Sequence, residues 1–195
     1  MKFAFACVMM CFLCCCGYHA PVHPAPPPVA VPMSAASPYE AHGFGYRLRG
    51  SREKLPDEHK DFTRLPGYPH TFSVWMNREL LQQPGKKSVC IELEKQRGLC
   101  LVDGVVAMDF PVCTGRGRKR TPKGVFHIKQ KRIDHHSNLY DCPMPYFMRL
   151  TWGGIGMHVG DVYRSPASHG CIRLPQVACE PLYHALPYGS RVVVE

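Results

Sequence analysis

The regular alternation of apolar and polar residues begins near Ser88. In "SVCIELEK", Val89, Ile91 and Leu93 alternate with other residues, a period that predicts a strand with one buried face. More short apolar runs follow, separated by turn residues: "GLCLVDG", "VVAMDFPVCTG", "GVFHI", "GGIGMHV" and "SRVVVE". This pattern predicts a mainly β domain over residues 88–195, a mixed β-sandwich or barrel-like sheet with one or two short helices.

The first two of these strands are expected to pair across a turn near Gln96 and Arg97. That register places Cys100 opposite Leu93 on the apolar face, whereas Cys90 points to the other side. Because side chains alternate between the two faces of a strand, the pattern disfavours a disulfide between these cysteines.

Two segments have helical patterns. "TFSVWMNRELLQQPG" predicts a short helix over residues 74–83, ended by a Pro-Gly pair. "PQVACEPLYHAL" predicts a second helix near the C-terminus. Pro181 is expected in the first turn of that helix, where a missing N–H costs nothing.

The N-terminus has the pattern of an export signal. Residues 1–16 begin with one early lysine and continue with an apolar run, too short for a permanent membrane span. Leu13, three residues before Cys16, gives the Leu-x-x-Cys pattern that resembles a bacterial lipoprotein signal, in which the cysteine is lipidated. An ordinary secretory peptide is the alternative, and the cleavage position stays open. Either way we expect an exported protein of the periplasm or cell envelope, held to a membrane where the cysteine carries lipid.

The next two segments differ in composition. Residues 17–38 are rich in proline, which fixes φ and predicts an extended, semi-rigid tether. Residues 39–87 form an N-terminal extension that contains the first predicted helix, preceded by charged and turn residues. This extension either wraps the domain or stays mobile.

Net charge and cysteine content limit the possible binding partners and disulfides of the chain. The net charge of +9 suits an anionic partner such as nucleic acid, a membrane surface or an acidic wall polymer, and it equally suits solubility alone. Nucleic-acid binding is disfavoured, because the basic run at residues 115–123 lacks interleaved aromatics and the chain is expected to be exported. The cysteines outside the signal are scattered, so a disulfide scaffold is not indicated.

The stretch "SHGCIRLP", residues 168–175, surrounds one cysteine with chemically useful neighbours. A free thiol has a pKa of about 8.5 and needs a base or a positive environment to attack a carbonyl. His158 ends the preceding strand and can face Cys171 across a loop, whereas His169 is too close along the chain to do so. Gly170 allows a tight backbone that turns N–H groups toward an oxyanion, and Arg173 can bind a carboxylate.

The segment from His158 to Pro175, "HVGDVYRSPASHGCIRLP", resembles the signature of the L,D-transpeptidase catalytic domain, the YkuD-like family. "FPVCTG…TPKGVFHI" and "MPYFMRLTWGGIGMH" resemble the preceding segments of that family. The resemblance covers about residues 88–195 and implies the YkuD-like fold, a mainly β structure. The His-Gly-Cys motif with its upstream histidine is its specific part.

The resemblance implies a role for each site residue. Cys171 is the nucleophile and His158 its general base, oriented by the carbonyl of Val159. The oxyanion site and its support are then formed by His169, Gly170, Ser168 and Arg173, and the donor groove is lined by Tyr146 and Met148. Ser168 braces the turn by hydrogen bonding, and Arg173 holds the turn or a substrate carboxylate.

The implied reaction has two half-steps on peptidoglycan stem peptides. Cys171 attacks the carbonyl at the L-centre of a diamino acid in a tetrapeptide stem and releases D-alanine. An amine then accepts the acyl group, giving a 3→3 cross-link or protein attachment. Water as acceptor would make the enzyme an L,D-carboxypeptidase. The scheme needs no metal and no cofactor.

Three other hypotheses compete with this one. Cys171 could be a packed core cysteine. His158, His169 and Cys171 could bind zinc, although the paired spacing of most zinc sites is missing. The protein could also be a non-catalytic peptidoglycan-binding lipoprotein that uses the same groove without turnover.

Overall fold

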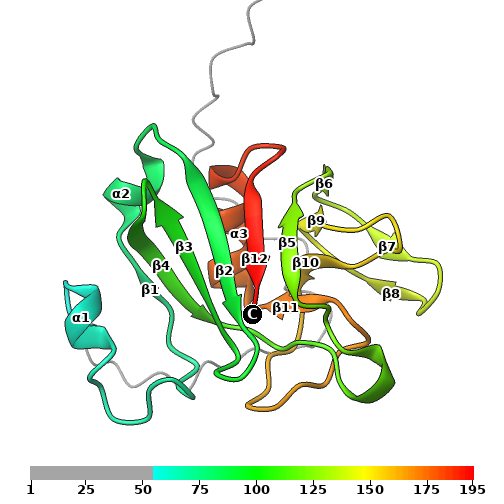
Figure 1. The fold of residues 1–195 in the computed structure, drawn as a ribbon, viewed down its shortest axis with the longest axis horizontal. Helices are drawn as coiled ribbons and strands as arrows, with labels where there is room; N and C mark the ends of the chain where they lie inside the picture. The colour runs from blue at the N-terminus through cyan, green and yellow to red at the C-terminus, as the bar shows by residue number, and fades with distance from the viewer. Residues whose placement is uncertain (1–54) are drawn as a thin grey trace, which may run out of the picture. The chain divides into compact units, whose positions relative to one another are not determined.

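A computed structural model describes residues 55–195 (Figure 1). The predicted signal, the predicted tether and residues 39–54 of the extension lie outside the described residues. The helical elements are α1 (His59–Phe62), α2 (Arg78–Gln82), the 3₁₀ turn η2 (Gly117–Lys119) and α3 (Gln176–Ala185). The strands are β1 (Trp75–Met76), β2 (Lys87–Glu92), β3 (Arg97–Val102), β4 (Val105–Pro111), β5 (Gly124–His127), β6 (Gln130–Arg132), β7 (His136–Ser137), β8 (Cys142–Pro143), β9 (Phe147–Arg149), β10 (Gly156–Val159), β11 (Ile172–Leu174) and β12 (Arg191–Val194).

The strands form two main sheets and a small hairpin. The 6-stranded sheet has the order β1-β4-β3-β2-β12-β5, and the 4-stranded sheet has the order β11-β10-β9-β6. Strands β7 and β8 pair with each other and project from the smaller sheet (Figure 1). The mainly β architecture expected from the sequence is therefore confirmed. Among the described helices, none has the length and apolarity needed to cross a membrane.

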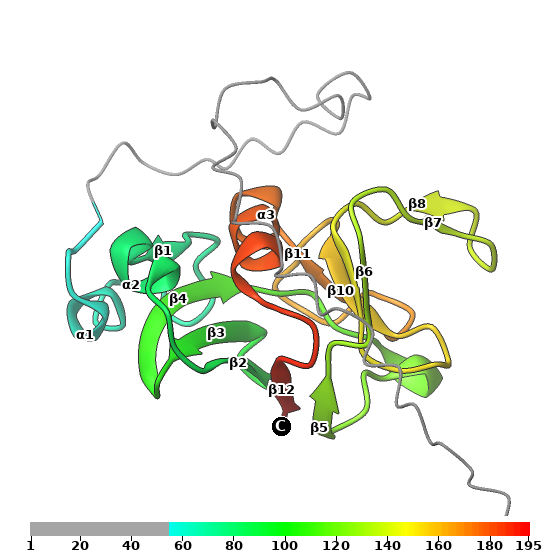
Figure 2. The ribbon, with the colours of Figure 1, turned by 90° about the horizontal axis from the view of Figure 1, so that it is seen from above.

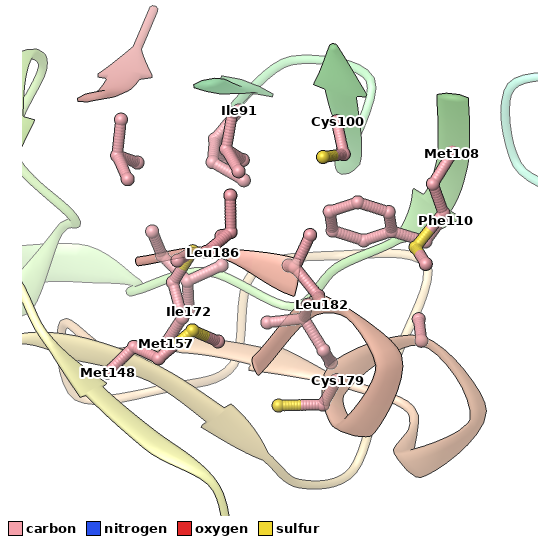
Figure 3. Close-up of a cluster of buried hydrophobic side chains, with 14 of the residues drawn as sticks. Ile91, Cys100, Met108, Phe110, Met148, Met157, Ile172, Cys179, Leu182 and Leu186 are labelled. Carbon is pink, nitrogen blue, oxygen red and sulfur yellow. The ribbon is translucent and has the colours of Figure 1, made fainter. Parts of the chain in front are cut away.

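The core lies between the two sheets and includes one face of α3, which Figure 2 shows between β4 and β11. Figure 3 shows Ile91, Cys100 and Phe110 of the larger sheet facing apolar side chains of the smaller sheet and of α3. Those opposing side chains are Met148, Met157, Ile172, Cys179, Leu182 and Leu186, each of them buried. Burial of this continuous apolar surface is the main force that holds the sheets together.

The pairing of β2 with β3 differs in register from the sequence expectation. Cys100 lies opposite Val89, not Leu93, because the turn occupies residues 93–96. Gln96 adopts φ 49° and its side-chain amide donates to the carbonyl of Leu93, which closes the turn earlier than the pattern suggests. Alternation fixes only the face of each residue, so Cys100 is still in the core and Cys90 still points away. The described cysteines are all free thiols.

The described part of the N-terminal extension contacts the larger sheet, where His59 and Thr71 hydrogen-bond to the side chains of Asp109 and Arg97. Its anchor is a buried ion pair between Arg97 of β3 and Asp109 of β4, both with fully buried side chains. Asp109 also accepts hydrogen bonds from His59 Nε2 at 2.8 Å and from Tyr68 Oη at 3.2 Å. Arg97 donates in turn to the carbonyl of Thr71 at 2.8 Å. We call residues 55–76 the strap.

The helix predicted over residues 74–83 is shorter than expected. Trp75 and Met76 form β1, which pairs with β4, and the helix begins only at Arg78. Asn77 is the N-cap, and its side chain accepts a hydrogen bond from the N–H of Leu80 at 2.9 Å. Backbone pairing with the edge of the larger sheet thus replaces the first helical turn that the sequence pattern suggests.

Helix α3 contains Pro181 in its interior, so the expectation that this proline lies in the first turn is wrong. A proline at this position leaves the carbonyl of residue 177 without its helical hydrogen bond. Val177 is 51% exposed, so water can reach that side of the helix.

Candidate active site

The four-stranded sheet brings Cys171 and His158 to one face. Strands β10 and β11 run parallel, with Met157 beside Ile172 and His158 beside Arg173. Met157 and Ile172 are fully buried in the core. Because side chains alternate along a strand, Gly156, His158, Cys171 and Arg173 all belong to the opposite face. We call this the catalytic face; on it Cys171 is a diagonal neighbour of His158.

The hydrogen bond of His158 defines its tautomer. Nδ1 lies 2.7 Å from the carbonyl oxygen of Val159. A carbonyl can only accept, so Nδ1 carries the proton and Nε2 of the neutral ring has a free lone pair. Burial lowers the pKa of His158 to about 4; the nearby positive charge of Arg173 acts in the same direction, and the Val159 hydrogen bond opposes it. At neutral pH the ring is therefore a free base.

The thiol of Cys171 is also neutral at rest. Burial raises its pKa above the ordinary value, while the N–H of Gly156 and the charges of Arg173 and Arg149 act against that rise. In this structure the thiol donates to the carbonyl of Gly154 at 3.7 Å. A neutral thiol that shares a sheet face with a neutral imidazole can attack only as its proton is removed, so the arrangement suits general-base catalysis rather than a preformed thiolate.

The turn before Cys171 is held by Ser168 and Thr121. Ser168 Oγ donates to the carbonyl of Cys171 and accepts from the N–H of Gly170 at 3.1 Å, contacts that the bracing role requires. Thr121 Oγ1 donates to the carbonyl of Gly170 at 2.9 Å and accepts from the N–H of Gly115. Gly170 has φ 118°, a conformation that favours glycine. Since its N–H already donates to Ser168 Oγ, Gly170 does not offer that N–H to an oxyanion, whereas the N–H of Cys171 is a candidate.

His169 and Arg173 lie two residues before and two residues after Cys171 in the chain. The His169 ring is exposed and stacks on Tyr140 of the β7–β8 hairpin, with centroids 4.6 Å apart. Arg173 is fixed by two backbone hydrogen bonds with Cys113, each 2.9 Å long. Its charge lowers the pKa of both His158 and Cys171, so it favours the thiolate of Cys171 and disfavours the protonated form of His158.

The two residues expected to line the donor groove lie on the wrong face. Met148 is fully buried and pairs with Met157 on the core side of the sheet. Tyr146 shares that side and contacts the rings of Tyr183 and His184 near α3. The alternation along β9 therefore corrects the expectation: Phe147 and Arg149 are the residues on the catalytic face.

Sequence reasoning missed Thr121, Phe147 and Arg149. The Phe147 ring covers Gly156, where a Cβ would lie only 2.5 Å from the ring, and its centroid is 6.4 Å from that of His158. The period-2 rule applied backwards from His158 through an antiparallel partner would have selected Phe147 and Arg149. Thr121 had a weaker signal, its place in the Thr-Pro-x-Gly turn.

The zinc hypothesis lacks its ligand set. Within residues 55–195, no three His, Cys, Asp or Glu side chains gather closely enough to hold a metal ion. His158, His169 and Cys171 therefore do not form such a group, and His169 turns instead to Tyr140.

Solved structures with similar folds are L,D-transpeptidases. The enzyme from Stackebrandtia nassauensis is 29% identical, with a TM-score of 0.53, and the match covers 58% of this chain and 57% of that one. The enzyme from Xylanimonas cellulosilytica is also 29% identical, with a TM-score of 0.53 and coverage of 58% and 62%. That from Enterococcus faecium is 28% identical, with a TM-score of 0.51 and coverage of 56% and 50%. The matched part thus spans less than two thirds of each of these relatives.

A search of curated protein sequences finds no significant match. The family model of the L,D-transpeptidase catalytic domain, YkuD, matches residues 86–194, which include every strand from β2 to β12. This chain is therefore a member of the YkuD L,D-transpeptidase catalytic domain family.

Proposed function

We propose that this protein is a cysteine L,D-transpeptidase that acts on peptidoglycan tetrapeptide stems. The observation that carries the proposal is the neutral His158, whose free Nε2 shares a sheet face with the Cys171 thiol. A base and a nucleophile held on adjacent strands are what acyl transfer through a thioester requires. The chemistry of the residues and the family membership support the same activity.

In the first half-step, the thiol attacks the carbonyl at the L-centre of the third stem residue. The S–C bond forms as the thiol proton passes to Nε2 of His158. Collapse of the tetrahedral intermediate breaks the C–N bond, and the imidazolium gives the proton to the departing amine of D-alanine. The N–H of Cys171 faces the developing oxyanion, and Arg173 stabilises negative charge near the sulfur.

In the second half-step, an amine attacks the thioester and loses a proton to His158. The C–N bond of the product forms, the C–S bond breaks, and the proton returns to sulfur. A stem amine gives a 3→3 cross-link, a protein lysine gives a protein attached to the wall, and water gives a carboxypeptidase product.

The test is mass analysis of stem peptides incubated with purified protein. Wild type is expected to release D-alanine and to form new dimers, and Cys171→Ala is expected to do neither. Cys90→Ala is a matched control, because Cys90 lies in the larger sheet and points away from the core. Alkylation of Cys171 should abolish activity, whereas EDTA should leave it intact. Absence of D-alanine release by wild type would support a binding protein instead.

We also propose that the protein is exported to the periplasm or cell envelope and anchored by lipid on Cys16. The proposal rests on the sequence of residues 1–38. Cell fractionation tests it: wild type should sediment with membranes, and Cys16→Ala should not. Equal distribution of the two proteins would favour an ordinary secretory signal.

A further inference from the structure

Arg149 lies on the catalytic face, two strands from the nucleophile. It is paired with Gly156 of β10 on one side and with Gln130 of β6 on the other. Its neighbour in sequence, Met148, points into the core, so Arg149 itself points away from the core. Gly156, which separates Arg149 from Cys171 on this face, contributes no side chain.

The guanidinium of Arg149 is held in a fixed orientation. Nε donates to Gln130 Oε1 at 2.9 Å, and Cζ lies 5.2 Å from the centroid of the Phe147 ring. Phe147 is fully buried beneath it and packs over Gly156. A guanidinium anchored through Nε and stacked on an aromatic ring keeps its two Nη groups ready for a planar acceptor.

This arginine has no acidic partner among residues 55–195. Arg97 provides a contrast within the same chain, because its buried guanidinium is matched by Asp109. The charge of Arg149 instead acts on the active site, where it lowers the pKa of Cys171 together with Arg173. The charges of Arg149 and Arg173 thus both act on the Cys171 thiol, and neither arginine forms an ion pair with a carboxylate among residues 55–195.

We propose that Arg149 binds a carboxylate of the acyl donor and makes the enzyme selective for stems that carry a free carboxylate close to the scissile bond. Two groups of a stem have this chemistry: the side-chain carboxylate of a diamino dicarboxylic acid in the acyl position, and the carboxylate of the terminal D-alanine. Both present the planar, two-oxygen acceptor that a guanidinium binds with two parallel hydrogen bonds. The inference rests on the proposed function, since it names the donor of that reaction.

Binding measurements test this role without requiring turnover. Three tetrapeptides are titrated calorimetrically into Cys171→Ala: the free acid, the side-chain amide and the C-terminal amide. Adding Arg149→Gln should weaken binding of the free acid on the order of tenfold or more. The amide that removes the contacted carboxylate should bind equally weakly with or without Arg149, which identifies that carboxylate. Arg149→Lys should recover part of the affinity, because it keeps the charge but loses the planar fork.

Arg191→Gln is the matched control, because it removes an exposed arginine from the larger sheet. It should leave all three affinities unchanged. The proposal is overturned if Arg149→Gln weakens the three peptides equally, if it weakens none, or if no peptide binds. Thermal unfolding of each variant separates loss of binding from loss of fold.

D-alanine release by the protein with Cys171 intact distinguishes this inference from the function itself. Release without discrimination between acid and amide donors would refute the role of Arg149 and leave the transpeptidase proposal standing. Selective binding without release would support the role of Arg149 and refute the enzyme.

Discussion

His158 should make the protein less stable in acid. The unfolded chain protonates this histidine near its ordinary pKa of 6.5, whereas the folded chain does so only near 4. The pKa of His158 is lower in the folded state, so the unfolded state binds more protons below pH 6.5. The free energy of unfolding therefore decreases as the pH is lowered. At 1.36 kcal/mol for each pH unit, this one group lowers the free energy of unfolding by about 2 kcal/mol at pH 5 and about 3 kcal/mol at pH 4.

The measurement is urea unfolding of wild type and His158→Gln at pH 7, 6, 5 and 4. Glutamine does not titrate, so the gap between the two proteins isolates His158 from the other acids and histidines. The gap should change by about 3 kcal/mol over this range, with wild type losing more stability.

Two stability curves that run parallel from pH 7 to 4 would refute the reasoning. They would mean that the folded protein protonates His158 as readily as the unfolded chain does. The burial that is expected to depress the pKa of His158 would then be wrong.

Three further predictions concern residues around the site and the strap. Removing the positive charge with Arg173→Gln should raise the pKa of His158, which moves the acid limb of kcat/KM for D-alanine release to higher pH; an unchanged pH profile would contradict this. Gly170→Ala should destabilise the fold by about 1–3 kcal/mol through backbone strain, measured by thermal unfolding, and should reduce D-alanine release. Unchanged thermal stability would contradict the strain. Asp109→Ala should lower the free energy of unfolding in urea by about 3–5 kcal/mol, because it leaves the charge of Arg97 buried without a partner. A loss below about 1 kcal/mol, as for an exposed ion pair, would argue against the buried pair.

The local part of the site is predictable from the sequence, because its information is local. Ser168, Gly170 and Cys171 are neighbours in the chain, and the short turn forces their backbone contacts. His158 ends an apolar run, and the loop that follows returns the chain beside it as a parallel strand. These residues are found without knowing the sheet order.

The rest of the site depends on long-range pairing. Tyr146 and Met148 lie near His158 in sequence. A difference of one residue along β9, however, determines whether a side chain lies in the core or on the catalytic face. Register is equally hidden: Cys100 was expected opposite Leu93 but lies opposite Val89, because a buried Gln96 shapes the turn. The sequence pattern also could not show that Trp75 would pair with β4 as a strand and so lie outside the predicted helix.

The strap shows that the contacts of the folded domain extend beyond the part of the chain that matches the family. The family match starts at residue 86, yet His59, Tyr68 and Thr71 complete the hydrogen bonds of an ion pair that lies inside the matched region. A shortened protein that began at the family boundary would expose that pair to water on a bare sheet face. Shortening the chain to the residues that match the family would thus remove the strap, which packs against the larger sheet.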